Sequence, residues 1–204
     1  QTVVKGRQRR PRDPHTVRTA VLDAAIELFA VHGFADTSLR DISRRSGISH
    51  PLILHHFGTK ESLYTEVKRR VVEGYAQRFP AAAGACHKPI DMKIELQRIM
   101  TYLGENEAAL RLCARTRVDG DYEVWPGEPN LFDLLEKRIG VAQEQGLLRD
   151  DLDARQLSIM VMGIVFFWLE NRRHFTKRFG KPIANKTYLR TAVTMIEEGL
   201  QPRT

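Results

Sequence analysis

The chain has 204 residues, of which 28% are charged and 42% hydrophobic, with two cysteines and a formal net charge of +7. That length buries a sizeable core without disulfides or a structural metal, which excludes a small cysteine-stapled scaffold. Residues 1–70 contain 13 Lys and Arg against 7 Asp and Glu, whereas residues 71–204 contain 19 against 18. This asymmetry favours a nucleic-acid-binding segment joined to a near-neutral module, although a solvated basic face explains the charge equally well.

The compartment follows from the absence of sequence signals. No charged segment followed by an apolar one opens the sequence, so we expect no secretory signal, and Cys86 and Cys113 form no framework or metal-ligand cluster. The apolar run over residues 159–169 is too short to cross a bilayer, which needs about 20 residues. We therefore expect a cytoplasmic protein with no membrane contact, no cofactor and no metal.

Residues 1–12 are basic and nearly free of apolar side chains, which predicts a flexible arm. Asp13 and Pro14 then begin a helix that ends at Gly33. Glycines and capping residues predict three more helices, over residues 38–46, 49–57 and 60–79.

Beyond Pro80 the apolar spacing stays helical. It predicts helices over residues 91–105, 109–116, 131–145, 153–174 and 188–200, with a loop over 118–130 where Asp-Gly, Pro and Gly cluster. The predicted fold class is all-α, with about nine helices.

The most informative segment is GFADTSLRDISRRSGISHPLILHHFGTKESLYTEV, residues 33–67. Its two short helices, joined by a tight glycine turn, cannot bury their apolar faces alone and must pack on the first helix. The inward positions are Leu39, Ile42, Ile48, Ile53 and Phe57. The outer face of the third helix then carries Ser49, His50, Pro51, Leu54, His55 and His56. A helix of this size fits the DNA major groove, where its N-terminal residues meet base edges.

The same segment resembles the signature of the TetR family of transcriptional regulators. The matching features are a Gly-Phe turn, Thr-Ser before the second helix, Gly-Ile-Ser before the third, then His-Phe and Lys-Glu-x-Leu, all between Val17 and Val67. The resemblance implies an N-terminal helix-turn-helix three-helix head and a C-terminal helical ligand-binding and dimerisation domain in an Ω-shaped homodimer. The expected domains are a basic arm (1–12), a DNA-binding domain with helix four as connector (13–79) and an effector-binding and dimerisation domain (80–204).

The resemblance also implies particular contacts with a double-stranded DNA operator. Thr37, Ser38 and Arg45 correspond to backbone contacts, Lys60 to a phosphate-gripping lysine, and Ser49, His50, Pro51, His55 and His56 to recognition-helix positions. Leu54 stands where the family commonly has tyrosine, so that phosphate contact is absent or replaced by contact with a thymine methyl group. His56 is alternatively a capping or packing residue, and the arm either a tail or a minor-groove contact. A histidine metal site is disfavoured because no carboxylate or cysteine shares that face.

The long helix is apolar nearly all round over residues 159–169, so it needs cover on two sides. One side faces its own subunit, and we expect the other to form a homodimer through the last two helices, with Gly163 allowing close approach. An effector pocket is expected between the helices at 91–105, 131–145 and 153–174, lined by Tyr102, Cys113, Trp125, Phe132, Met162, Phe166 and Trp168. Core packing is an alternative for each of the seven. Arg111, Arg115 and Arg117 either meet an anionic ligand or form a solvated face.

The sequence thus predicts a sequence-specific transcriptional regulator, a repressor released from a palindromic operator by an unidentified small-molecule effector. An activator fits as well, since polarity depends on where the operator lies. One alternative is a non-specific or architectural DNA-binding protein. An enzyme is disfavoured because the sequence has no P-loop, dinucleotide-binding glycine turn, nucleophile elbow or metal-ligand spacing.

Overall fold

The computed structural model describes residues 13–80 and 87–202. Over these residues the chain forms α-helices and no strand, which confirms the predicted all-α class. The nine helices are α1 (Pro14–His32), α2 (Leu39–Ser46), α3 (His50–Phe57), α4 (Lys60–Arg78), α6 (Met92–Glu105), α7 (Glu107–Val118), α8 (Glu128–Glu144), α9 (Ala154–Phe179) and α10 (Asn185–Gly199). The predicted basic arm and Cys86 lie outside the described residues.

Helix starts follow the local chemistry of the cap residues. The side chains of Asp13, Ser38 and Asp153 accept hydrogen bonds from the backbone N–H groups of Thr16, Asp41 and Gln156, as the sequence predicts. Each bond satisfies one of the donors that a helix N-terminus leaves unpaired.

Three predicted bounds in the C-terminal half are wrong by three residues or more, and one of them is the start of α10 (Asn185–Gly199), predicted at 188. Helix α8 begins at Glu128 rather than 131, because Gly127 adopts a left-handed φ of 86° as its N-cap and Pro129 is tolerated in a first helical turn. Helix α9 continues past His174 to Phe179, where Gly180 takes a left-handed conformation and ends it. The connection between α7 and α8 is correspondingly shorter than predicted.

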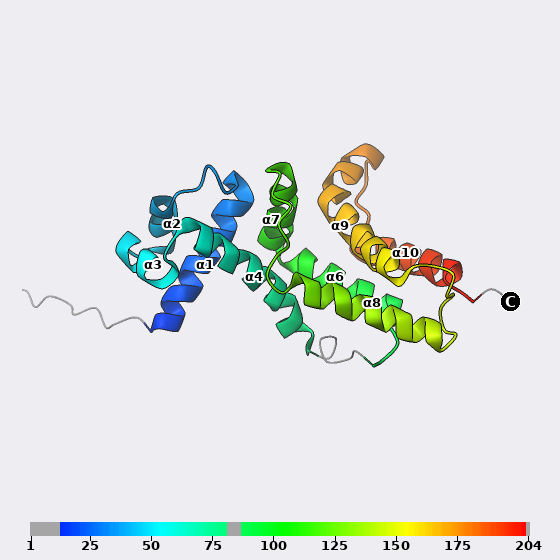
Figure 1. Ribbon diagram of the computed structural model, residues 1–204. Helices are drawn as coiled ribbons and strands as arrows, with labels where there is room; N and C mark the ends of the chain where they lie inside the picture. Colours follow the sequence, from blue (N-terminus) through cyan, green and yellow to red (C-terminus); the bar gives the residue numbers. More distant parts are fainter. Residues whose placement is uncertain (1–12, 81–86, 203–204) are drawn as a thin grey trace, which may run out of the picture.

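The helices pack around two apolar cores. One joins α1, α2, α3 and α4 with Ala109 and Leu112 of α7 and with Trp125; the other joins α6, α8, α9 and α10 with Leu110 of α7. Figure 1 shows α1–α3 grouped at one end, α9 and α10 at the other, and α4 running from the first group toward α6 and α8. We call α1–α3 with the first half of α4 the head, and α6–α10 the body. Helix α7 is shared between the two cores and packs on α1.

The packing of α3 on the head core leads to a first prediction. Ile53 is fully buried against the head core, whereas its neighbour Leu54 is 39% exposed. We expect Ile53→Ala to lower the free energy of unfolding by about 2–5 kcal/mol through lost burial and a cavity. Leu54→Ala, the control, should change it by less than about 0.5 kcal/mol. Urea denaturation followed by circular dichroism measures both, and equal losses would contradict the packing described.

Candidate nucleic-acid interface

The outer face of α3 is accessible to solvent. Ser49, Pro51, Leu54 and His55 are exposed, His50 and His56 are half-buried, and Ile53 and Phe57 point into the core, as the sequence predicts. Ser49 precedes the helix and makes no capping bond with its side chain, and Pro51 lies in the first turn. The structure therefore presents hydroxyl, imidazole and aliphatic groups at the N-terminal half of a helix that is anchored from behind.

Helix α3 is held in place by a residue that the sequence reasoning missed. The guanidinium of Arg18 on α1 lies 4.7 Å from the Phe57 ring centroid, donates to the His56 carbonyl and pairs with Glu66 of α4. Together with Ser62 and Thr65, these residues line a hollow of about 310 Å³ behind the C-terminal end of α3. Arg18 gives no sequence signal because its partners lie 38 and 48 positions away along the chain.

The start of α2 combines one confirmed cap with one buried threonine. Ser38 and Asp41 form a reciprocal capping box, and the hydrogen bond from the Ser38 hydroxyl, followed by that from Arg44, lowers the pKa of Asp41 to about 2. Thr37 is only 2% exposed, and its hydroxyl donates to the Gly33 carbonyl at 2.8 Å. The Thr37 hydroxyl therefore secures the turn between α1 and α2, and a DNA contact at Thr37 stays a prediction.

Two basic side chains flank α3. The Lys60 ammonium group, at the first residue of α4, lies 4.2 Å from the Phe34 ring centroid and donates to the Ala35 carbonyl at 3.3 Å. Arg45, near the end of α2, donates from Nε to Glu27 of α1 at 2.8 Å, with both side chains about half exposed. Exposed ion pairs contribute little stability, so Arg45 can exchange Glu27 for a phosphate at small cost.

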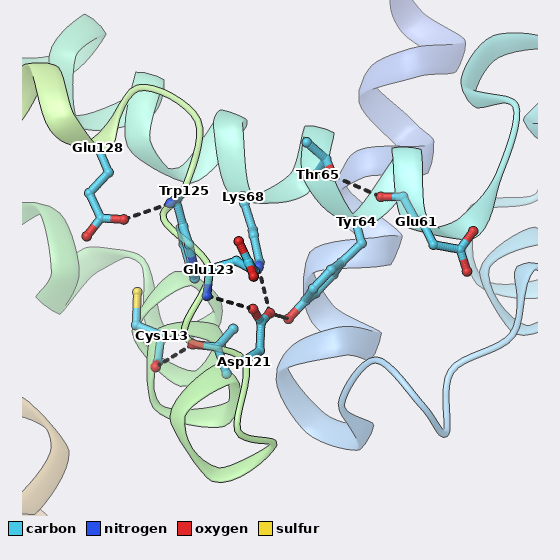
Figure 2. Close-up of polar contacts among 10 residues, drawn as sticks. Glu61, Tyr64, Thr65, Lys68, Cys113, Asp121, Glu123, Trp125 and Glu128 are labelled. Carbon is cyan, nitrogen blue, oxygen red and sulfur yellow. Dashed lines mark hydrogen bonds and ion pairs between the residues drawn. The ribbon is translucent and has the colours of Figure 1, made fainter.

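The head meets the body at a buried ion pair on α4. Lys68 is 6% exposed, and its ammonium group lies 2.6 Å from the Asp121 carboxylate in the loop after α7. The Tyr64 hydroxyl donates to the same carboxylate at 3.0 Å, and the Glu123 N–H donates to its other oxygen (Figure 2). Burial and then the bond to Asp121 raise the pKa of Tyr64. These contacts fix the loop after α7 against α4.

A second contact ties α1 to α7. Gly33, with a φ of 81°, ends α1 directly against the Arg115 and Asp119 side chains, which pair with each other at 2.8 Å. A Cβ at this position would force the ends of both side chains to shift, and the positive φ itself favours glycine.

The seven predicted effector residues do not form one group. Trp125 belongs to the head core, and Cys113 packs against it, with burial raising the pKa of the Cys113 thiol to about 12. Trp168 is stacked on Tyr188 at 4.3 Å and donates to Asn185, facing α10. The structure therefore does not bring all seven side chains together, because long-range packing directions cannot be obtained from helical periodicity, and ligand contact by these residues stays a prediction.

The other four predicted effector residues lie on helices of the body. The Tyr102 hydroxyl donates to the Val71 carbonyl of α4 at 2.6 Å. Phe132, Met162 and Phe166 are half-buried in the body. Arg111, Arg115 and Arg117 pair with Glu107, Asp119 and Glu170 respectively, so each already has an acidic partner.

Within the described ranges, no group of three or more His, Cys, Asp or Glu side chains is arranged to hold a metal ion. None of the described helices is long and apolar enough to cross a membrane.

The Lys68–Asp121 pair carries a testable consequence. Asp121→Ala leaves a buried ammonium group unpaired, so we expect a loss of about 3 kcal/mol in unfolding free energy at neutral pH. Glu107→Ala, which removes an exposed ion-pair partner of Arg111 and Arg173, should cost less than about 1 kcal/mol. Chemical denaturation of both variants measures the difference.

The pH dependence of the same pair has a definite sign. Burial raises the pKa of Asp121, but hydrogen bonds from Lys68 and Tyr64 outweigh this and hold it below its usual value. Stability from the pair is therefore fully present above the unfolded-state pKa, about 3.9, and is lost as the pH falls through the folded-state pKa. Asp121→Ala should flatten the acid limb of stability against pH, and an unchanged limb would contradict this assignment.

Comparison with known proteins finds matches to both the N-terminal and the C-terminal part of the chain. Residues 21–67 match the family model described as bacterial regulatory proteins, tetR family, and residues 123–198 match that of the tetracyclin repressor-like C-terminal domain. A Mycobacterium tuberculosis HTH-type transcriptional repressor is 47% identical over 57 residues, covering 28% of this chain and 30% of that protein. The Escherichia coli HTH-type transcriptional regulator RutR is 30% identical over 105 residues, covering 48% and 49%. The matched part of the chain thus spans less than half the length of either relative.

The fold agrees over almost the whole chain. The crystal structure of the TetR family transcriptional regulator PfmR from Thermus thermophilus superposes with a TM-score of 0.63 at 22% identity, covering 92% of this chain and 98% of that one. The two matched models lie in the head and the body, and their order along the chain is that of the structure. The chain belongs to the TetR family of bacterial regulatory proteins.

Proposed function

We propose that the chain is a sequence-specific DNA-binding transcriptional regulator that acts as a dimeric repressor. The observation that carries the proposal is the outer face of α3, which presents Ser49, His50, Leu54 and His55 on a helix anchored from behind by Ile53 and Phe57. Such a helix inserts into the major groove and reads bases through its N-terminal residues. Ser38, Pro51, His56 and Arg45 complete the proposed DNA contacts, with Lys60 on a flanking phosphate.

The body supports dimerisation through the last two helices. Ile159, Met160 and Phe167 on α9 and Met195 on α10 are each more than half exposed. Large apolar side chains gathered on one part of a surface mark an interaction site rather than a solvated face. A second copy on this face places two α3 helices for the two halves of a palindromic operator.

An effector that binds better to a dimer with the wrong separation of α3 helices would release the repressor. Two major-groove half-sites require about 34–36 Å between recognition helices, or a multiple. The affinity lost for the operator equals the differential affinity of the effector for the two states.

Selection from random duplex DNA tests the function, and an inverted repeat should be enriched. Lys60→Ala should weaken binding to the enriched and to scrambled duplexes alike and reduce the slope of log K against log salt by about one per half-site, since it removes a phosphate contact. Exposed Lys177 on α9 is the matched control, and Lys177→Ala should leave both quantities unchanged.

Base reading is tested separately. His55→Ala should reduce the preference for the enriched site by about 1–3 kcal/mol at one position of each half-site while leaving non-specific binding intact. Binding with a steep salt dependence and no enriched sequence would instead support an architectural DNA-binding protein.

The dimer face gives a further prediction. Phe167→Asp places a charge in the proposed apolar interface, so we expect monomers in light scattering and loss of tight operator binding. Val118→Asp is the control, because Val118 is exposed at the end of α7 and does not belong to either helix of the proposed interface. A Phe167→Asp protein that remains dimeric would rule out this face.

A further inference from the structure

A buried polar cluster lies in the body where three helices meet. Glu95 of α6 and Arg138 of α8 are 5% and 6% exposed, and Arg138 Nη1 donates to Glu95 at 2.9 Å. Arg98 donates to the same Glu95 oxygen at 3.3 Å, and the Tyr75 hydroxyl of α4 donates to the other. The cluster therefore joins α4, α6 and α8 through one carboxylate.

The charges of this cluster do not balance. Two guanidinium groups, those of Arg98 and Arg138, share the single negative charge of Glu95. Tyr75 does not supply a second, because burial and the neighbouring Glu95 raise the pKa of its hydroxyl and keep it neutral. An excess positive charge of one in a largely buried site is costly unless an anion joins it.

The guanidinium of Arg138 has a free edge. Its Nε is buried and, among the residues that the structure describes, has no hydrogen-bond partner, while the bond to Glu95 uses Nη1. The Nε–H and the outer Nη group of a guanidinium form a planar fork that matches the two oxygens of a carboxylate. The unpaired edge therefore has the geometry to bind a carboxylate, and a carboxylate also supplies the negative charge that the cluster lacks.

The surroundings of Arg138 favour an otherwise apolar molecule. Its neighbours along α8, Leu135 and Ile139, belong to the body core, as do Leu96 and Ile99, which follow Glu95 and Arg98 on α6. Small-molecule sites typically combine such an apolar lining with a few polar groups that fix orientation. Of the arginines suggested by the sequence, Arg115 and Arg117 each have an acidic partner of their own. Arg111 shares Glu107 with Arg173 but is half exposed, whereas Arg138 shares a buried carboxylate with Arg98.

We propose that Arg138 binds the carboxylate of a small apolar monocarboxylic acid, which is the effector of this regulator. The inference rests on the proposed function for its regulatory meaning, but the binding site stands on its own geometry. One carboxylate brings the charge of the cluster to zero, whereas a phosphate dianion exceeds it and a neutral amide leaves the excess in place. Tyr75 belongs to α4, which begins at Lys60 in the head, so the site is linked to this helix through Glu95, the shared partner of Tyr75 and Arg138.

A matched ligand panel tests the site in the full-length protein. Aliphatic monocarboxylates from acetate to dodecanoate and aromatic ones from benzoate to naphthoate are each compared with their primary amides by thermal shift, and hits are titrated calorimetrically. We expect acids of one size and shape to bind, with their amides at least about tenfold weaker, because the amide lacks the charge-assisted hydrogen bonds. If no acid outperforms its amide, the proposal is wrong.

Two variants assign the binding to Arg138. Arg138→Lys keeps the charge but removes the planar fork, so we expect the acid to bind about ten- to a hundredfold more weakly. Arg155→Lys is the control, because Arg155 pairs with Glu136 across α9 and α8 with its side chain 74% exposed, and it should bind as the parent does. Undiminished acid binding in Arg138→Lys overturns the assignment. If Arg138→Lys fails to fold, the comparison of acid with amide on the parent protein still decides.

Measuring the affinity for the operator enriched from random duplex DNA, with and without the acid, distinguishes failure of the ligand site from failure of the proposed function. Acid binding that lowers operator affinity supports both, and acid binding without an enriched operator supports the site while the proposed function fails. A specific operator with no preference for acids over amides leaves the regulator standing and overturns the carboxylate site.

Discussion

The arrangement of head and body depends on a buried lysine that needs a negatively charged partner. The ammonium group of Lys68, on α4, is buried beside the rings of Tyr64 and Trp125. A buried charge requires a counter-charge at contact distance. Asp121 supplies it from the loop after α7. Because the partner comes from the body, the head cannot complete its own core without α7 and the loop that follows it. The ion pair contributes less net stability than its distance implies, since both groups lose water, but it fixes which surfaces meet.

Helix α4 carries the other consequences of this constraint. Lys60 lies at its first residue beside the recognition surface, Lys68 near its middle, and Tyr75 in its last turns on the buried cluster of the body. The Tyr102 hydroxyl adds a bond from α6 to the Val71 carbonyl of the same helix. One continuous helix therefore contacts the proposed DNA surface, the junction and the proposed ligand site.

The sequence predicted those parts of the fold that local chemistry decides. Caps at Asp13, Ser38 and Asp153 and the inward spacing of Ile53 and Phe57 are properties of a few adjacent residues, and the structure confirms them. Trp125 was misplaced because its partners are remote in the chain, and helical periodicity gives no direction for a residue in a loop. The inward direction of the Thr37 hydroxyl could not be predicted either, because its partner, the Gly33 carbonyl, is set by the turn between α1 and α2.

Arg138, in the proposed ligand site, is difficult to identify from the sequence as a binding residue. It occupies a core-facing position of α8, in register with Leu135, Ile139 and Ala142, and its periodicity alone marks it as a member of the apolar stripe. An arginine in that register is informative because burying it demands partners from other helices. From Tyr75 to Lys60, α4 spans about 22 Å at 1.5 Å per residue. A tilt of about 5° at the Tyr75 end would displace Lys60 by about 2 Å. The head is also held by Asp121, in the loop after α7, and by the contact of Gly33 with Arg115 of α7. If the proposed ligand at Arg138 moves the head, α7 and the loop after it would have to move with α4, so we expect the Lys68–Asp121 pair to take part in the coupling.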